Sequence, residues 1–383
     1  MTEIRKILHV IPSVAAVHGG PSVMVGMMTR GLAQAGIEVH VATTNDDGAG
    51  RLNVPCGVPV ERDGLTYWYF NRQLSFYKYS RPLSQWLSRH VGDYQLVHIH
   101  AFFSHSSCAA ARRARQQGVP YIVRPLGVLN RWGMENRRPW LKKLSLRFLE
   151  RPIVDGAALM HYTSEQERYE ASLLGVRTRS EVIPNPVPSA AVAGSRACFF
   201  ARHPELTGRP VILFLSRIDR KKGLELLLPA FARVRARFPA AALVIAGSGD
   251  EVLIRELRGQ MNDIVWTGFV AGEYKADAFA AADVFVLPSW SENFGVAVVE
   301  AMAAGCPVVV TDQVAVHTDI AAAGAGLVVP CDPNAIALAL CRVLEDGSAR
   351  ETMGTNGQHL TRTHFSPEAV TSRLLAAYRS ILN

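Results

Sequence analysis

Residues 290–305 read WSENFGVAVVEAMAAG, and this stretch decides how the second half of the chain folds. An apolar run, Val284–Leu287, precedes it and predicts a buried strand. Asn293 is the expected N-cap of a helix that runs to about Ala304, where Gly305 ends it. The first N–H groups of such a helix attract phosphate. The stretch therefore predicts a strand, a tight loop and a helix that together suit an anionic ligand.

Two glutamates, Glu292 and Glu300, bracket this loop and the start of the helix. On a continuous helix they would lie roughly 12 Å apart, about the reach from the sugar to the ribose of a nucleotide sugar. One carboxylate at each end, with amides between them, would hold a sugar, a diphosphate and a ribose. The alternative is that both are solvated helix residues, although Glu300 lies among apolar residues, where a charge needs a partner.

Length and composition set the broad class of the protein. The chain has 383 residues, 49% of them hydrophobic, which predicts two domains of similar size. The formal charge of +8 suits an anionic ligand, an anionic membrane surface or nucleic acid, and nucleic acid ranks last because no nucleic-acid motif is present. Six cysteines without metal-ligand spacing indicate reduced thiols of a cytoplasmic protein. The first ten residues are too polar for a signal peptide, and no apolar run reaches the roughly 18 residues of a membrane span.

A glycine-containing loop follows the first predicted strand, Lys6–Ile11. It includes Gly19 and Gly20 and leads into a helical pattern that ends near Gln34. A strand, a glycine loop and a helix let backbone amides approach a phosphate. The dinucleotide fingerprint GxGxxG is absent, and a tight turn that needs glycine explains the loop equally well.

Histidines mark the end of another predicted strand, Gln95–His100. His98 and His100 alternate with apolar residues and are expected on one side of the strand, and His105 follows at its carboxyl end. Ligands bind at the carboxyl ends of strands in open α/β sheets, so His100 and His105 are candidates for contacts with an acceptor or a sugar. A histidine buried in the core is the more common explanation for either one.

A basic amphipathic helix is predicted from Arg137 to Leu149, with Trp140, Leu144 and Phe148 on its apolar side. Such a helix, with a Trp near its start, can lie on an anionic bilayer. An ordinary domain helix with a solvated charged face is the alternative.

The segment Pro184–Pro188 is the clearest break in the chain, because its three prolines continue neither a helix nor a central strand. We place the domain boundary there, with one domain over residues 1–188 and a second over residues 189–366. Arg217 and Lys222 lie in a basic turn after the next predicted strand, Val211–Ser216, where an anion site and a solvated turn are equal alternatives. Strands and helices alternate in both halves, which predicts two doubly wound parallel sheets.

Over essentially its whole length the chain resembles the retaining glycosyltransferases of family 4, which have two Rossmann-like domains facing across a cleft in the GT-B fold. The most specific parts are Ser291-Glu292-Asn293-Phe294-Gly295 with Glu300-Ala301, the turn Ser216-Arg217…Lys222-Gly223, and His18-Gly19-Gly20. Ile183-Pro184-Asn185-Pro186-Val187 looks like the family's interdomain Pro-Asn-Gly-Val, with Pro186 in place of Gly. Each motif alone is weak, but their order makes the resemblance specific. It also implies that the last helix, in residues 367–383, crosses back to the first domain.

The resemblance implies roles for matching residues. Glu292 would contact the hydroxyls of the donor sugar, Glu300 the ribose, and Arg217 and Lys222 the diphosphate, while the loop around Trp266 would face the base. The predicted donor-binding residues are Gly19, Gly20, Arg217, Lys222, Trp266, Asn293, Phe294, Gly295, Val296 and Glu300. Glu292 and His100 are the predicted catalytic residues, with His105 and Arg124 on the acceptor or sugar side.

One departure concerns residues Pro125-Leu126-Gly127, where relatives often carry a basic residue that faces the sugar. Leu126 has no side-chain donor, so either Arg124 replaces the missing contact or the sugar is of a 6-deoxy type.

The expected reaction moves a sugar from a nucleotide sugar to a hydroxyl of a glycan or lipid-linked acceptor with retention, as in polysaccharide biosynthesis. No Asp-x-Asp occurs, so no metal or other cofactor is expected, and Arg217, Lys222 and helix N–H groups would carry the charge. The expected location is cytoplasmic, with peripheral contact to the inner membrane face. A nicotinamide oxidoreductase should show GxGxxG, which is absent. A non-catalytic sugar-nucleotide-binding protein and a sugar-nucleotide epimerase on the same fold stay open as alternatives.

Overall fold

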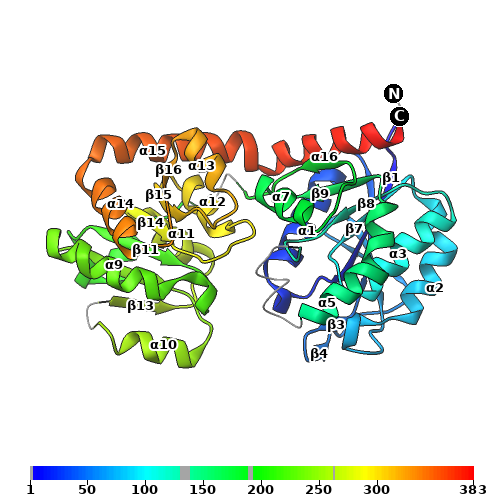
Figure 1. Ribbon diagram of the computed structural model, residues 1–383, viewed down its shortest axis with the longest axis horizontal. Coiled ribbons are helices and arrows are strands. Elements are labelled where there is room, and N and C mark those ends of the chain that lie inside the picture. Colours follow the sequence, from blue (N-terminus) through cyan, green and yellow to red (C-terminus); the bar gives the residue numbers. More distant parts are fainter. Residues whose placement is uncertain (1–2, 130–138, 189–192, 262–263) are drawn as a thin grey trace. The chain divides into compact units, whose positions relative to one another are not determined.

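The computed structural model describes residues 3–129, 139–188, 193–261 and 264–383, and it divides into two compact units (Figure 1). Unit 1 comprises Met1–Pro186 and Pro367–Asn383, and unit 2 comprises Val187–Ser366. The division after Pro186 lies two residues before the predicted boundary at 188, within the same proline-rich segment. The residues from Pro367 onward belong to unit 1, so the chain passes between the units twice.

Unit 1 is built on one sheet, in the order β10-β9-β8-β7-β1-β2-β6-β5, and all its neighbouring strands are parallel except the pair β5 and β6. Its strands are β1 (Lys6–Ser13), β2 (Glu38–Thr44), β5 (Pro59–Arg62), β6 (Leu65–Phe70), β7 (Leu96–His100), β8 (Tyr121–Arg124), β9 (Leu159–Tyr162) and β10 (Ser180–Val182). A separate antiparallel ribbon joins β3 (Asp46–Asp47) and β4 (Gly50–Arg51). Strands such as β7 and β8 are buried along their whole length, as expected for a sheet covered on both faces.

Helices cover both faces of this sheet. The α-helices are α1 (Gly20–Gln34), α2 (Arg81–His90), α3 (His105–Gln116), α5 (Pro139–Ser145), α6 (Arg151–Asp155), α7 (Glu165–Leu173) and α16 (Pro367–Leu382). Short turns of other helix types are η1 (Ala16–His18), η2 (Phe76–Lys78), η3 (Val91–Asp93) and the π-helical η4 (Leu146–Glu150). Figure 1 shows α16 (red) beside the strands of the N-terminal half, where Val370, Leu374 and Tyr378 join one buried cluster with residues of β1 and α1.

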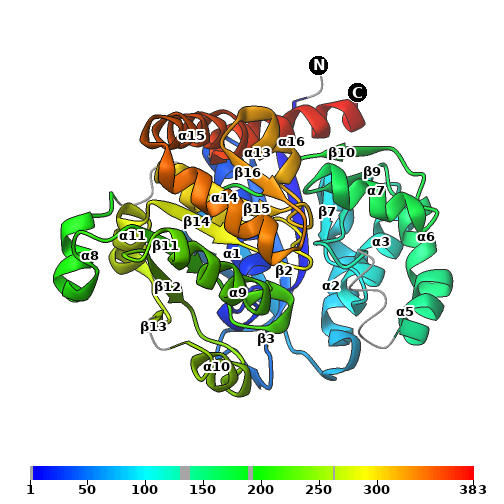
Figure 2. The same ribbon diagram turned by 60° about the vertical axis from the view of Figure 1, so that its left-hand side comes forward.

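Unit 2 has a six-stranded parallel sheet in the order β13-β12-β11-β14-β15-β16 (Figure 2). Its strands are β11 (Val211–Leu215), β12 (Ala242–Ala246), β13 (Ile264–Gly268), β14 (Val284–Leu287), β15 (Val308–Thr311) and β16 (Gly326–Val329). Its α-helices are α8 (Arg196–Arg202), α9 (Leu224–Arg237), α10 (Glu251–Arg258), α11 (Gly272–Ala281), α12 (Val296–Ala303), α13 (His317–Ala323), α14 (Pro333–Glu345) and α15 (Gly347–Leu360), with the turns η5 (Pro204–Leu206), η6 (Arg220–Lys222) and η7 (Thr361–Phe365).

Each sheet has one place where the strand order reverses. In unit 1 it lies between β1 and β7, and in unit 2 between β11 and β14. Open α/β sheets bind ligands outside the carboxyl ends of the strands at such a reversal. The loops after β1 and β7, and the loops after β11 and β14, are therefore where functional residues are expected. The predicted fold class, two doubly wound parallel-sheet domains, is confirmed.

No helix in the described ranges is both long and apolar enough to cross a membrane.

Candidate functional site

An ion pair joins the two loops at the strand reversal of unit 2. Lys222 follows β11 and Glu292 follows β14, and the Lys222 Nζ donates to the Glu292 carboxylate. Their side chains are only 12% and 17% exposed, so each charge needs the other in this setting. The structure thus brings together two residues that the sequence placed 70 positions apart.

Backbone contacts hold both loops in place. The Glu292 N–H donates to the carbonyl of Gln313 (2.9 Å), and the Ala315 N–H donates to the carbonyl of Glu292 (2.9 Å). The N–H of Trp290 donates to the carbonyl of Lys221 (2.9 Å), which links the loop after β14 directly to the loop after β11. Because Glu292 is fixed through its own backbone on the segment after β15, its carboxylate is presented from a rigid base.

The helix after this loop begins later than the sequence predicts. Asn293 is not its N-cap: α12 begins at Val296, and Gly295 caps it with φ 86°, a backbone conformation that favours glycine. The bridge between Glu292 and Val314 keeps residue 292 extended and outside the helix. The separation along a continuous helix therefore does not apply to Glu292 and Glu300. No side chain caps the first turn of α12, as a phosphate-binding helix end requires.

Glu300 has the partner that its apolar surroundings call for. Its carboxylate accepts from the Lys275 Nζ of α11 at 2.7 Å. The sequence indicated that Glu300 needs a partner but not which residue supplies it, because Lys275 lies on another helix, 25 positions earlier.

The remaining predicted donor residues line the same carboxyl edge of unit 2. The Arg217 side chain is exposed and lies 3.3 Å from Asp219, and burial lowers the pKa of the neighbouring Lys221. Trp266 is on β13, with the Arg258 guanidinium 5.3 Å from its ring centroid. Phe294 is buried against Phe365, so its ring is not available to a ligand. These positions are compatible with the predicted roles.

In unit 1 the glycine loop is held by a buried carboxylate that the sequence did not indicate. Gly19 (φ 66°) caps α1 and has open space around it. The preceding residue, His18, contacts Asp46 at 2.7 Å, and Asp46 also binds Arg72 and, at 2.6 Å, Lys78. Burial alone would raise the pKa of Asp46, but hydrogen bonds from Lys78 and Arg72 outweigh it and hold that pKa below its usual range. Two cationic side chains, Lys78 and Arg72, around one carboxylate leave this corner positive.

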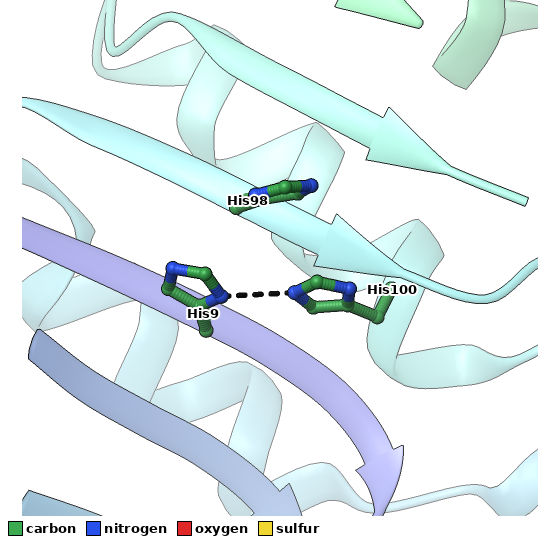
Figure 3. A group of neighbouring side chains, drawn as sticks. All are labelled: His9, His98 and His100. Carbon is green, nitrogen blue, oxygen red and sulfur yellow. Dashed lines mark hydrogen bonds between the residues drawn. The ribbon is translucent and has the colours of Figure 1, made fainter. Parts of the chain in front are cut away.

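The histidines of β7 face one side of the strand, as predicted, with ring centroids 4.4 Å apart. Both are fully buried, and His9 of β1 lies beside them, its Nδ1 2.9 Å from the Nε2 of His100 (Figure 3). Burial holds the pKa of His100 well below its ordinary value. The interpretation of His100 as a catalytic residue is therefore corrected: it is a neutral core histidine without access to a sugar.

A chain of hydrogen bonds continues from this group to the ends of unit 1. The Nε2 of His161 lies 2.7 Å from the carbonyl of Ile183 and must donate to it, which leaves its Nδ1 as an acceptor. That nitrogen accepts from the Nε2 of His98 (3.2 Å), and the Nδ1 of His98 accepts from the Tyr378 hydroxyl (2.8 Å). Each tautomer is thus assigned from its neighbour, and all rings in the chain are neutral.

His9, His98 and His100 have nitrogens within 4.8 Å of one another, which would allow a metal ion by distance. The surroundings do not fit one. Both nitrogens of His98 already serve the hydrogen-bond chain, and the cation of Arg124 lowers the pKa of all three histidines. A buried positive charge so close would oppose a second one.

Arg124 itself does not face solvent. Its side chain is fully buried, and one guanidinium nitrogen donates to Asn185 of the segment that leads to the domain boundary. The suggestion that Arg124 replaces the basic residue missing at Leu126 is therefore corrected, because β8 turns its guanidinium into the core. Leu126 has φ 59°, and the next amide, Gly127 N–H, donates to Glu167 at 2.6 Å. His105 begins α3 half-buried, and its acceptor role stays a prediction.

Two family models match this chain, one in each half. Residues 19–186 match the family model described as "Glycosyl transferase 4-like domain", and residues 196–360 match "Glycosyl transferases group 1". The chain belongs to the GT-B glycosyltransferases. The second match covers both lysine–glutamate pairs, and the first begins at the glycine loop.

Several curated relatives of this glycosyltransferase are transferases by name. The phosphatidyl-myo-inositol mannosyltransferase of Mycolicibacterium smegmatis is 36% identical over 208 residues, 52% of this chain and 51% of the relative. The alpha-D-kanosaminyltransferase of Streptomyces kanamyceticus is 32% identical over 181 residues, 46% and 47% of the two chains. The alignments thus span about half the length of these relatives.

Solved structures share the fold over nearly the full chain. The sucrose-phosphate synthase of Thermosynechococcus elongatus has a TM-score of 0.77 at 22% identity and covers 98% of this chain and 99% of its own. HepE of Anabaena, in complex with UDP and glucose, has a TM-score of 0.77 at 18% identity, covering 98% and 100%. At these identities the likeness establishes the fold.

Proposed function

We propose that this glycosyltransferase moves a sugar from a nucleotide sugar to a hydroxyl of a glycan or lipid-linked acceptor, with retention and without a metal ion. The observation that carries the proposal is the lysine–glutamate pair at the strand reversal of unit 2, where Lys222 and Glu292 meet beside the uncapped start of α12. A diphosphate needs cations and N–H groups, and a sugar needs a carboxylate for its hydroxyls. This corner offers both within one set of fixed loops.

In this reaction the protein must above all stabilise the negative charge that develops on the leaving diphosphate. This negative charge would be stabilised by Lys222, by the exposed Arg217 and by the first amides of α12. Because these groups are already held in place, they need no rearrangement when the charge develops. Glu292 would hold the sugar hydroxyls, and Glu300, aligned by Lys275, would hold the ribose. These assignments follow the chemistry of the side chains and their places along the edge.

The acceptor proton needs a base on the face from which the leaving group departs. His100 is buried and neutral and cannot take this proton, so we assign the role to the leaving phosphate oxygen. The protein then acts by orientation and charge stabilisation.

The acceptor class is inferred from the surface of unit 1 and from the relatives. Trp140, Leu144 and Phe148 are exposed on α5 and η4, while the N-terminal part of the predicted basic helix lies outside the described residues. The apolar stripe faces outward instead of packing on the core, as a bilayer-surface helix requires. One relative is named a phosphatidyl-myo-inositol mannosyltransferase, after a lipid. We therefore favour a lipid-linked acceptor, as in polysaccharide biosynthesis, reached from the cytoplasmic face of the membrane.

A thermal-shift panel of UDP-, GDP- and ADP-sugars, with magnesium or with EDTA, tests the proposal. A ligand that binds only the folded state adds about 2.7 kcal/mol of stability at a hundredfold excess over its Kd. We expect one nucleotide series to raise the Tm equally in magnesium and in EDTA, and Glu300→Gln to weaken the shift while Glu273→Gln, an exposed change on α11, does not. A shift seen only with magnesium would contradict the metal-free mechanism.

The same panel separates the alternatives. Binding followed by isomerisation of the donor without any acceptor would identify an epimerase. Binding without turnover toward any hydroxyl would identify a sugar-nucleotide-binding protein. No shift with any donor, in protein shown to be folded, would overturn the donor site.

A further inference from the structure

Backbone strain gathers at the carboxyl edge of unit 1. Tyr77 (φ 54°) and Lys78 (φ 50°) lie in the hairpin 73–79 that follows β6, and Ala101 (φ 81°) and Phe103 (φ 54°) lie in the loop that follows β7. Positive φ is unfavourable for residues other than glycine, so it persists only where the surroundings impose it, and such residues cluster at functional sites. The contacts that hold these residues at positive φ are therefore expected to serve function.

One buried carboxylate, Glu150, holds both segments. It ends the π-helical turn η4 and is fully buried. Its Oε1 accepts from the Phe103 N–H at 3.1 Å and from the Tyr77 hydroxyl, which also lies 3.1 Å from Ser145 Oγ. A single oxygen thus joins the loop after β7 to the hairpin after β6.

The other end of the hairpin is held by Asp46. Lys78 donates to Asp46 at 2.6 Å, and Asp46 in turn contacts His18, next to the glycine loop. The hairpin also meets His105, whose Nδ1 accepts from the Ser80 N–H (3.3 Å) and whose ring lies 4.4 Å from that of Tyr79. Two successive strained residues, Tyr77 and Lys78, are therefore fixed by two separate carboxylates.

We propose that Glu150 is a positioning residue for the acceptor side of this enzyme, holding the hairpin 73–79 and the loop 101–104 in the conformation in which they present His105 and the glycine loop. The proposal rests on the proposed function in one respect, that the acceptor binds at the carboxyl edge of unit 1. We call the contacts of Glu150 with the hairpin 73–79 and the loop 101–104 the clamp. All of these residues belong to unit 1, so the clamp can be tested without any substrate.

The contacts of Glu150 bear on the protonation state of its carboxyl group. The Oε2 of Glu150 has no hydrogen-bond partner among the described residues, so a negative charge on this buried carboxyl would be poorly compensated. Burial raises the pKa of Glu150 to about 7, against the lowering effect of its hydrogen bonds with Tyr77 and Phe103. The proton on a neutral Glu150 therefore belongs on Oε2.

The neighbouring titratable groups keep their protonation over the pH range that matters. Tyr77 of η2 and Cys108 of α3 face Glu150, and burial raises the pKa of both, that of Cys108 to about 12. Lys142 of α5 lies over the ring of Phe103 at 5.8 Å from its centroid. Of the groups that touch the Glu150 carboxyl, Glu150 is thus the one that titrates between pH 5 and 8, while burial lowers the pKa of His105, which meets the hairpin through Ser80 and Tyr79.

Linkage gives the sign of the pH effect. If opening of the clamp exposes Glu150 to water, its pKa returns toward the ordinary value near 4.5. The opened form then loses its proton first as pH rises, so opening becomes about tenfold easier per pH unit between 4.5 and 7 and changes little above 7.

Hydrogen exchange of the full chain, expressed as protection factors at pH 5, 6, 7 and 8, tests the proposal. In the wild type we expect protection of segments 73–79 and 101–104 to fall by up to about tenfold per unit between pH 5 and 7 and then to level. Glu150→Gln, which stays neutral, should remove this pH dependence and keep the segments protected. Glu150→Ala should expose both segments at every pH, and Tyr77→Phe only segment 73–79. Glu181→Gln, an exposed change on β10, should match the wild type.

Two results would overturn the inference: an unchanged pH profile in Glu150→Gln, or unchanged protection of both segments in a folded Glu150→Ala. A second readout distinguishes a local clamp from a general loss of fold. Arg217, Lys222, Glu292 and Glu300 lie in unit 2, whereas Gly19 and Gly20 lie in unit 1, so Glu150→Ala should keep most of the thermal shift produced by the nucleotide sugar that the panel selects. If no nucleotide sugar shifts even the wild type while the exchange profile follows the prediction, the clamp stands and the proposed function fails.

Discussion

The carbonyl oxygen of Pro288 occupies the place where a side chain on Gly223 would begin. A Cβ on residue 223 would lie 1.9 Å from that oxygen, and the glycine also has φ 69°. Pro288 follows β14, and Gly223 ends the basic turn after β11. The loop that supplies Lys222 and the loop that supplies Glu292 can therefore approach each other only because residue 223 has no side chain.

Gly223→Ala should separate these loops and break the Lys222–Glu292 pair. We expect a destabilisation of about 2 kcal/mol or more in urea unfolding, from strain at positive φ and overlap with backbone, together with loss of nucleotide-sugar binding. Gly208→Ala is the matched control, because Gly208 has φ 76° but a Cβ added there would meet no atom within 4 Å. Gly208→Ala should lose stability only through the strain at positive φ and should keep donor binding. An equal loss of donor binding in both variants would refute the role of the close approach between Gly223 and Pro288.

Glu292→Gln should remove most turnover while the fold persists. The amide keeps the size of the side chain but loses the charge that a sugar-binding carboxylate supplies, so we expect kcat to fall on the order of 100-fold. The two backbone hydrogen bonds of residue 292 are unaffected, but Lys222 loses its charged partner, so the melting temperature should fall by several degrees while the protein stays folded. Steady-state kinetics with the donor found by thermal shift gives the measurement, and full activity of the variant would defeat the assignment.

How much of this site the sequence could predict depends on how local each feature is. Glu292, Glu300, Lys222 and the glycine loop belong to short motifs beside strand ends, and the structure places them where such motifs predict. Lys275 could not be predicted, because nothing near it in the sequence indicates a partner on another helix. Asp46 and Glu150 were missed for the same reason, since their partners come from separate loops.

The errors have physical causes too. Asn293 has the chemistry of an N-cap, but the pairing of residue 292 with the segment after β15 keeps this part of the chain extended until Gly295. His100 and Arg124 lie at strand ends, where functional residues gather, yet both turn into the covered face of the sheet. Which face of a fully covered parallel strand meets a ligand is decided by the helices packed on it, and hydrophobic alternation along the strand does not reveal this.

Trp140 and Phe148 should anchor unit 1 to anionic bilayers. Their side chains are 67% and 63% exposed, so replacing either by Ala removes little from the fold but takes apolar area from a bilayer contact. We expect the wild type to float with vesicles of phosphatidylcholine and phosphatidylglycerol, and each variant to bind on the order of tenfold more weakly. Tyr169→Ala, at an exposed aromatic position on α7, is the control. Absence of flotation for the wild type, or an equal loss in the control, would remove the membrane partner.

Mild acid should destabilise this protein at a pH where many others keep their stability. His9, His98, His100 and His161 are fully buried, and burial lowers the pKa of each, that of His9 to about 3. In the unfolded chain these histidines take up protons below their ordinary value of 6.5, so the stability that their neutral burial provides is present above pH 6.5 and is lost as pH falls below it.

Glu150 acts in the opposite direction, since its raised pKa adds stability as pH falls from about 7. Summed over these five groups, we expect a net loss of about 3 kcal/mol between pH 6.5 and 5.5, measured by urea unfolding at fixed ionic strength. His100→Leu should reduce this slope by removing one titrating group, whatever it does to the absolute stability, and Glu150→Gln should steepen it. His359→Leu, at an exposed histidine, should leave the slope unchanged. A stability that does not vary between pH 7.5 and 5.5 would mean that these histidines become charged in the folded protein, and the tautomers assigned from Ile183 to Tyr378 would then be wrong.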